Sequence, residues 1–80
     1  MNMNQIKVKF SRFIEPGTQN PVFKDGDGIE YFWPSSDKIE MKVSGRHFWD
    51  ELGYNQSLTY TISAKEEKGL KVVSVVYKIK

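Results

Sequence analysis

The sequence predicts a mainly β fold, in which residues 1–80 form a single domain, a five-stranded Greek-key barrel with one short helix between strands 3 and 4. Several segments alternate apolar and polar residues with the period of two that half-buried strands show, and clusters of Gly, Pro and Asp separate them. One segment instead places apolar residues four positions apart behind a Ser, as a helix does. Because the chain has no Cys, its five Phe, four Tyr and two Trp must supply much of one small core.

The first strand is predicted from residues 5–10, where three apolar side chains face one way while Lys7 and Lys9 face the other. The strand continues to residue 14, but the alternation slips at residues 11–12. We expect a bulge or a sharp bend there, because one extra residue in a strand shifts the alternation by one.

Two connecting segments enclose the second strand. Residues 15–21 hold two Pro and one Gly and form a loop, and residues 25–28, Asp-Gly-Asp-Gly, form a turn. Residues 22–24 therefore pair across that turn with residues 29–33 as a hairpin. The turn is not expected to bind calcium, because Ile29 stands at the fifth position of the loop and no Glu stands at the twelfth.

A third clear strand is predicted at residues 38–43, which alternate again. Ser44 then provides the N-cap of a helix over residues 45–52, and Gly53 suits its C-terminal end. A helix of this length is stable only when it packs against the rest of the fold.

The last two strands are predicted at residues 58–62 and 70–79, joined by a charged turn at residues 65–69. Three strands, a helix and two strands is the order of an OB-fold barrel. In this order, in size, and in the lysine-flanked first strand Ile6-Lys7-Val8, the chain resembles small OB-fold single-stranded nucleic-acid-binding proteins of the cold-shock or filamentous-phage type. The aromatic motifs of cold-shock strands two and three are absent. An SH3-like barrel or a helix-capped meander is the competing architecture.

The formal charge of +2 is unevenly distributed along the chain. Residues 1–14 hold three basic and no acidic residues, residues 15–37 hold one basic and five acidic residues, and residues 65–80 hold five basic and two acidic residues. If the two ends lie side by side, their charges form one positive surface. If they lie apart, the pattern has no such consequence.

The run Tyr31-Phe32-Trp33 predicts at least one outward-facing ring, because successive strand residues point to opposite faces. Two registers remain open. Either Phe32 is exposed while Tyr31 and Trp33 face inward, or the reverse holds. An outward ring could stack on a nucleic-acid base, whereas an inward Trp33 belongs to the core.

The helix carries a second aromatic group. We expect Phe48 and Leu52 to plug one end of the barrel, which leaves Trp49 to one side of that stripe. Trp49 and Arg46 then form either a corner that stacks on bases or binds a partner, or a helix whose Trp covers the barrel end. We expect His47 to be an exposed helix residue rather than a ligand or a base.

These features predict a protein that binds single-stranded DNA or RNA with little sequence preference, through lysines on the backbone and rings on the bases. Lys7, Lys9 and Lys71 would contact the backbone, while Phe32, Trp33 and Trp49 would stack. The wider basic set includes Lys78 and Lys80. The candidate binding residues are Lys7, Lys9, Arg12, Phe13, Phe32, Trp33, Lys42, Arg46, Trp49, Lys71 and Tyr77.

The alternative is a protein-interaction module or a small phage-type inhibitor that uses the same rings. Glu30, Asp50 and Glu51 favour it, because they adjoin Phe32 and Trp49 in sequence. We expect no catalysis, no cofactor and no metal site, since the chain has one His and no motif for nucleophilic or acid–base chemistry. With no apolar leader or membrane span in view, we expect a cytoplasmic protein, encoded by a phage or mobile element and able to form a homodimer.

Overall fold

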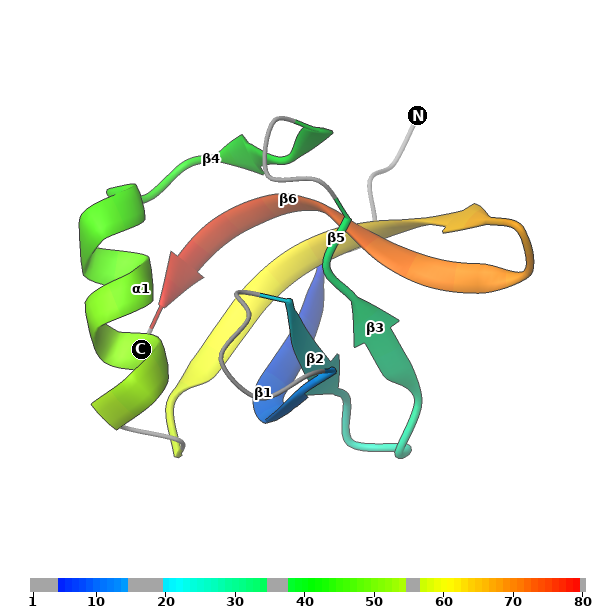
Figure 1. Cartoon of the computed structure of the whole chain (residues 1–80), viewed down its shortest axis with the longest axis horizontal. Helices are drawn as coiled ribbons and strands as arrows, with labels where there is room; N and C mark the ends of the chain where they lie inside the picture. Colours follow the sequence, from blue (N-terminus) through cyan, green and yellow to red (C-terminus); the bar gives the residue numbers. More distant parts are fainter. Residues whose placement is uncertain (1–4, 15–19, 35–37, 55–56, 80) are drawn as a thin grey trace.

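The structure, a computed structural model, describes residues 5–14, 20–34, 38–54 and 57–79. These residues form six strands and one helix (Figure 1). The elements are β1 (Ile6–Phe13), β2 (Pro21–Lys24), β3 (Glu30–Phe32), β4 (Glu40–Met41), α1 (Gly45–Tyr54), β5 (Thr59–Glu67) and β6 (Leu70–Ile79). The prediction of a mainly β fold with one short helix is confirmed.

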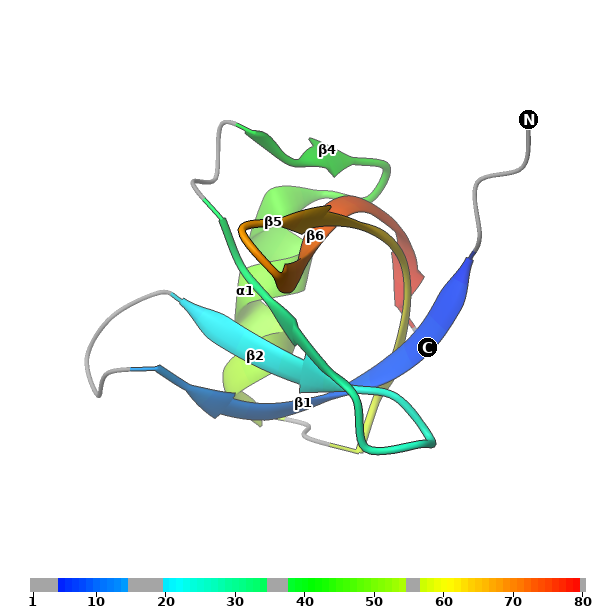
Figure 2. The same cartoon turned by 90° about the vertical axis from the view of Figure 1, so that its right-hand side faces the viewer.

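Five of these strands close into a mixed barrel. Each strand of the order β3-β2-β1-β5-β6 pairs antiparallel with its neighbour, and a parallel pair between Phe32 of β3 and Val72 of β6 completes the ring. Figure 2 shows the strands curling around a common interior, with α1 behind them. The predicted five-stranded barrel is therefore confirmed, and its architecture is compatible with an OB-fold.

The strand expected at residues 38–43 is wrong in its extent. Only Glu40–Met41 forms a ladder, parallel to Val75–Val76 of β6 and outside the closed ring. The β3 pair at Val72 occupies the same edge of β6 at an earlier position, and nothing in the pairing explains why residues 38–39 and 42–43 stay outside the ladder. The hairpin arm β3 is thus the third barrel strand, and α1 lies between the third and fourth strands of the barrel.

The predicted irregularity in β1 is confirmed as a bulge. The register with β2 shifts between Phe10 and Arg12. A bulge bends and twists its strand, so β1 pairs with β5 through its first half and extends along β2 through its second half. The Phe10 and Phe13 ring centroids lie 5.0 Å apart across the bulge.

The helix begins where the sequence predicts. The Ser44 hydroxyl oxygen accepts a hydrogen bond from the backbone N–H of His47 at 3.3 Å, as an N-cap does. The predicted end at Gly53 is wrong, because the helix runs through Gly53 to Tyr54. This single helix of ten residues falls short of the length and apolar character that crossing a membrane requires, within the described part of the chain.

Phe48 plugs the barrel end as expected, with no exposed surface. Its ring stacks on Trp33 at a centroid distance of 5.0 Å and meets Tyr60 at 5.5 Å and Phe23 at 6.3 Å. Leu52, one turn later, is also buried. One short helix is thereby held against rings from three different strands or their ends.

The Asp-rich segment forms a turn, as predicted. The Asp25 carboxylate accepts hydrogen bonds from the N–H groups of Asp27 and Ile29 and, at 2.8 Å, from the Tyr31 hydroxyl. The Tyr31 hydrogen bond contributes most to lowering the pKa of Asp25. Gly28 has φ +83°, a conformation that glycine adopts without strain.

A turn joins β5 and β6 as predicted, but its predicted extent of residues 65–69 is wrong, because Lys65, Glu66 and Glu67 continue β5 and pair with β6. Glu67 pairs with Leu70, so the turn has Lys68 and Gly69 as its two central residues, with φ values of 53° and 81°. Positive φ at both central positions matches the right-handed twist of the flanking strands.

Two buried tyrosines, Tyr31 and Tyr60, make the stability of the core depend on pH. Burial raises the pKa of Tyr60 to about 12, and burial together with Asp25 raises that of Tyr31 to about 12. The folded state thus disfavours the phenolate, while the unfolded state ionises near pH 10. We expect the free energy of unfolding to hold below pH 10 and to fall between pH 10 and about pH 12.

Denaturant unfolding at pH 9 and pH 11 measures this loss of stability. The absorbance of the phenolates after a rapid pH jump measures the ionisation of the tyrosines in the folded protein. Tyr60→Phe is the matched variant, because the Tyr60 hydroxyl has no hydrogen-bond partner among the described residues. The variant should keep the stability of the parent at pH 7 and lose less of it at pH 11. Ionisation of every tyrosine near pH 10 in the folded protein would contradict the expectation.

Candidate functional site

Lysines from three strands meet on the outside of the barrel. Lys7 and Lys9 flank the buried Val8 on β1 and point outward. Lys9 pairs with Lys24 of β2 on one side and with Thr59 of β5 on the other. Lys7 pairs with Thr61, which in turn pairs with Lys78 of β6. We call this surface the lysine face; it comprises Lys7, Lys9, Lys24, Thr59, Thr61 and Lys78.

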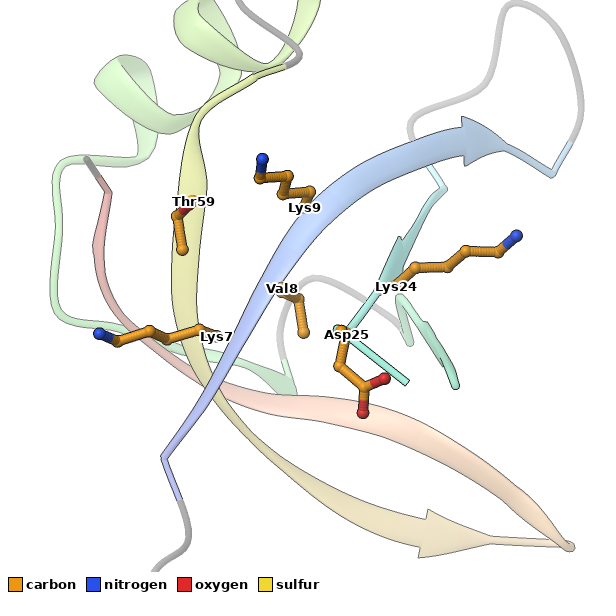
Figure 3. Close-up of a pocket in the computed structure, with 7 residues that line it drawn as sticks. Lys7, Val8, Lys9, Lys24, Asp25 and Thr59 are labelled. Carbon is orange, nitrogen blue, oxygen red and sulfur yellow. The ribbon is translucent and has the colours of Figure 1, made fainter. Parts of the chain in front are cut away.

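Two adjoining hollows lie on the lysine face. The larger, of about 500 Å³, is lined by Lys7, Val8, Lys9, Lys24, Asp25, Gly26 and Thr59. The smaller, of about 180 Å³, is lined by Lys7, Thr59, Thr61 and Lys78. Figure 3 shows Lys7 and Lys9 extending on the β5 side of β1 and Lys24 extending on the other side. Lys7 and Thr59 border both hollows, so the two hollows adjoin.

The lysine face carries four positive charges, and the carboxylate of Asp25 lines its larger hollow. None of its four lysines has a carboxylate within 4.0 Å among the residues that the structure describes. Lys9 and Lys24 stand directly opposite each other, an arrangement of like charges that destabilises a sheet. Glu30 pairs with Lys24 across the hairpin, but its carboxylate forms an ion pair with Arg12.

The two ends of the chain lie side by side, but of the five basic residues at 65–80 only Lys78 belongs to the lysine face, and Lys80 lies outside the described residues. β1 and β6 flank β5, and Lys7 and Lys78 border the same hollow. Arg12, Lys42 and Lys71 do not belong to the lysine face, because each has an acidic neighbour: Glu30, Glu40 at 2.7 Å and Glu66 at 4.0 Å, respectively. The hydrogen bond from Lys42 to Glu40 raises the pKa of Lys42.

The register of the aromatic run is now settled. Tyr31 and Trp33 are 4% and 7% exposed and face the core, while the half-buried Phe32 lies on the outside. Trp33 therefore leaves the set of residues that could stack on a base. Phe32 pairs with Val22 of β2, and Val22 pairs with Arg12 of β1. Val22 is two residues before Lys24 on β2, so Phe32 lies on the same face of the sheet as Lys24.

The remaining predicted site residues lie apart from the lysine face. Trp49 is half-buried and meets Trp33 and Phe48 edge-on at 5.6 and 5.0 Å, so it covers the barrel end. Arg46, 91% exposed, stands 4.0 Å from Asp50 on the same helix. Phe13 packs on Phe10, and the Tyr77 hydroxyl accepts a hydrogen bond from Ser63 at 3.0 Å.

Sequence reasoning missed Lys24, Thr59 and Thr61 as site residues. Their alternation with buried neighbours indicates that they face outward, but only the pairing of β2 and β5 with β1 shows that they flank Lys7 and Lys9. Comparison of the chain with models of protein families, with curated proteins and with solved structures found no match.

The repulsion on the lysine face predicts a gain in stability when one charge is removed. Lys9→Gln should raise the free energy of unfolding by about 0.2–1 kcal/mol at low salt, and the gain should shrink in high salt as the charges are screened. Thermal or urea unfolding at two salt concentrations measures this.

Lys68→Asn is the control, because it removes one charge at a positive-φ turn position that Asn tolerates. Lys68 lies in the β5–β6 turn, outside the lysine face, and its replacement should give no such salt-dependent gain. A Lys9→Gln protein less stable than the parent at low salt would rule out net repulsion.

Proposed function

We propose that this protein binds single-stranded nucleic acid with little sequence preference, with the phosphate backbone on the lysine face and a base against Phe32. The observation that carries the proposal is the row of lysines from β2, β1 and β6 with no carboxylate in ion-pairing distance among the described residues. Phosphate contacts by lysine release counterions and supply most of the affinity of such proteins.

The unfavourable pairing of Lys9 with Lys24 supports an anionic ligand. A sheet gains nothing from placing two ammonium groups opposite each other, and a local rule broken in this way is typical of functional sites. A bound phosphate would turn the repulsion into two attractions. The compatibility of the barrel with an OB-fold is in keeping with this use, since OB-folds bind oligonucleotides.

Phe32 supports a preference for single strands. It is the ring of the Tyr31-Phe32-Trp33 run that keeps an outer-face position, and only unpaired bases present a face on which it could stack. Trp33 and Trp49 are packed in or against the core, so we expect binding to leave tryptophan emission nearly unchanged. This differs from a mechanism in which both tryptophans stack.

The salt dependence of oligonucleotide binding tests the lysine face. For oligo-dT, the logarithm of the association constant should fall with the logarithm of salt concentration with a slope of about −3 if all four lysines contact phosphates. Lys9→Gln should lower affinity and reduce the slope by about 0.7, since one phosphate contact is lost. Fluorescence anisotropy with a dye-labelled oligonucleotide measures both quantities.

Lys68→Asn serves again as the charge-matched control and should keep both the affinity and the slope of the parent. If the parent shows no binding in low salt, or if the two variants behave alike, the lysine face does not bind nucleic acid.

Replacement of Phe32 tests the base contact. Phe32→Ala should weaken binding of single strands by about 1–3 kcal/mol, the value of one stacked base, and leave duplex binding unchanged. Parallel titrations with single-stranded and double-stranded probes measure the difference, and a thermal melt verifies the fold. Equal losses for both probes would point to a general loss of structure rather than to stacking.

A second candidate function is binding of a partner protein at β2 and β3. Phe32 lies beside the neutralised Arg12 and Glu30 pair, and the adjoining Ile29 is 41% exposed, so this patch is less positive than the lysine face. If Phe32→Ala keeps full affinity for single strands, a protein partner becomes the better explanation of the exposed ring. Homodimer formation, a phage origin and a cytoplasmic location stay predictions from the sequence.

A further inference from the structure

The lysine face consists of two rows that cross the barrel strands. In the first row the strand register places Lys24, Lys9 and Thr59 side by side on β2, β1 and β5. In the second row it places Lys7, Thr61 and Lys78 side by side on β1, β5 and β6. Each row therefore contains two lysines and one threonine, with paired residues about 5 Å apart at Cβ. In the first row the Lys24 side chain extends to the other side of β1 from Lys9 and Thr59 (Figure 3), so it must swing across β1 to share a phosphate with them.

The two hydroxyl groups are available for a ligand. Within the described residues no hydrogen bond engages the side chain of Thr59 or Thr61, and both residues border the smaller hollow. Thr61 is only 7% exposed and lies between Lys7 and Lys78, so its rotamers are restricted by packing. A hydroxyl fixed between two cations is suited to donate to a phosphate oxygen.

We propose that each row binds one phosphate of the same strand, with the threonine hydroxyl donating a hydrogen bond to a non-bridging oxygen and the ammonium groups neutralising the charge. This rests on the proposed function and assigns Thr59 and Thr61 as phosphate-binding residues. The rows are two residues apart on β1, a distance of about 7 Å. Successive phosphates of an extended strand are separated by a distance of this order.

The arrangement also sets the direction of the bound strand. Because the rows follow each other along β1, the backbone runs along the seam between β1 and β5. Beyond the bulge, the next row contains Arg12, Val22 and Phe32. Phe32 lies on β3, two strands from β1, so a strand that continues past Lys9 must turn across β2 to reach the ring to which the base contact is assigned.

Thr59→Val and Thr61→Val test the hydroxyl groups. Valine keeps the shape of threonine and favours strands, so both variants should melt as the parent does. Each should lower the affinity for oligo-dT about ten- to a hundredfold, because a hydrogen bond to a charged group is lost. The slope against salt should stay as in the parent, because no counterion contact is removed. Thr59→Ser and Thr61→Ser keep the hydroxyl group, so they should bind with the affinity of the parent.

The outcomes separate the two proposals. If the valine variants bind as tightly as the parent while Lys9→Gln still reduces the salt slope, the hydroxyl groups do not contact phosphate and the lysine face still does. A reduced slope in the valine variants, or failure of serine to restore binding, would also overturn the role of the hydroxyl groups. If the parent does not bind oligo-dT in low salt, both proposals fall together.

Discussion

The packing of Phe48 against the inner rings is the constraint on which the rest of the structure depends. A chain of 80 residues without disulfides has few apolar groups to spare, and Phe48 joins α1 to Phe23, Trp33 and Tyr60 within 6.3 Å between centroids. This packing holds Trp33 inward. Because successive strand residues alternate, an inward Trp33 leaves Phe32 on the outside, so the core decides which ring the surface can use.

The same alternation explains what could be predicted from the sequence. The break in the apolar–polar alternation at Ser11 and Arg12 predicted the bulge. Asp25 and Gly28 predicted the turn of the hairpin, and Ser44 predicted the start of the helix. Each of these signals is local: the residue that carries it also forms the hydrogen bond or the backbone angle that it predicts.

The features that could not be predicted depend on pairing between distant strands. Residues 38–43 alternate as a strand should, yet only Glu40–Met41 pairs with β6, outside the closed ring. Lys24 joins Lys9 only through the register of β1 with β2, and a slip of one residue would send Lys24 to the other face. Lys7, Lys9 and Lys78 could therefore be expected from the distribution of charge along the chain, whereas Lys24, Thr59 and Thr61 could not.

Closure of the barrel by a single parallel pair has a mechanical consequence. Every other pair of neighbouring strands in the barrel has at least three paired residues, while β3 and β6 form a joint only at Phe32 and Val72. We expect the barrel to open first at that joint, which has the fewest paired residues and stands across the ring from β1. The cations on β1 would then keep their spacing, whereas Phe32, the ring assigned to the base contact, lies at the joint itself, so local opening would move the base contact and leave the phosphate contacts on β1 in place.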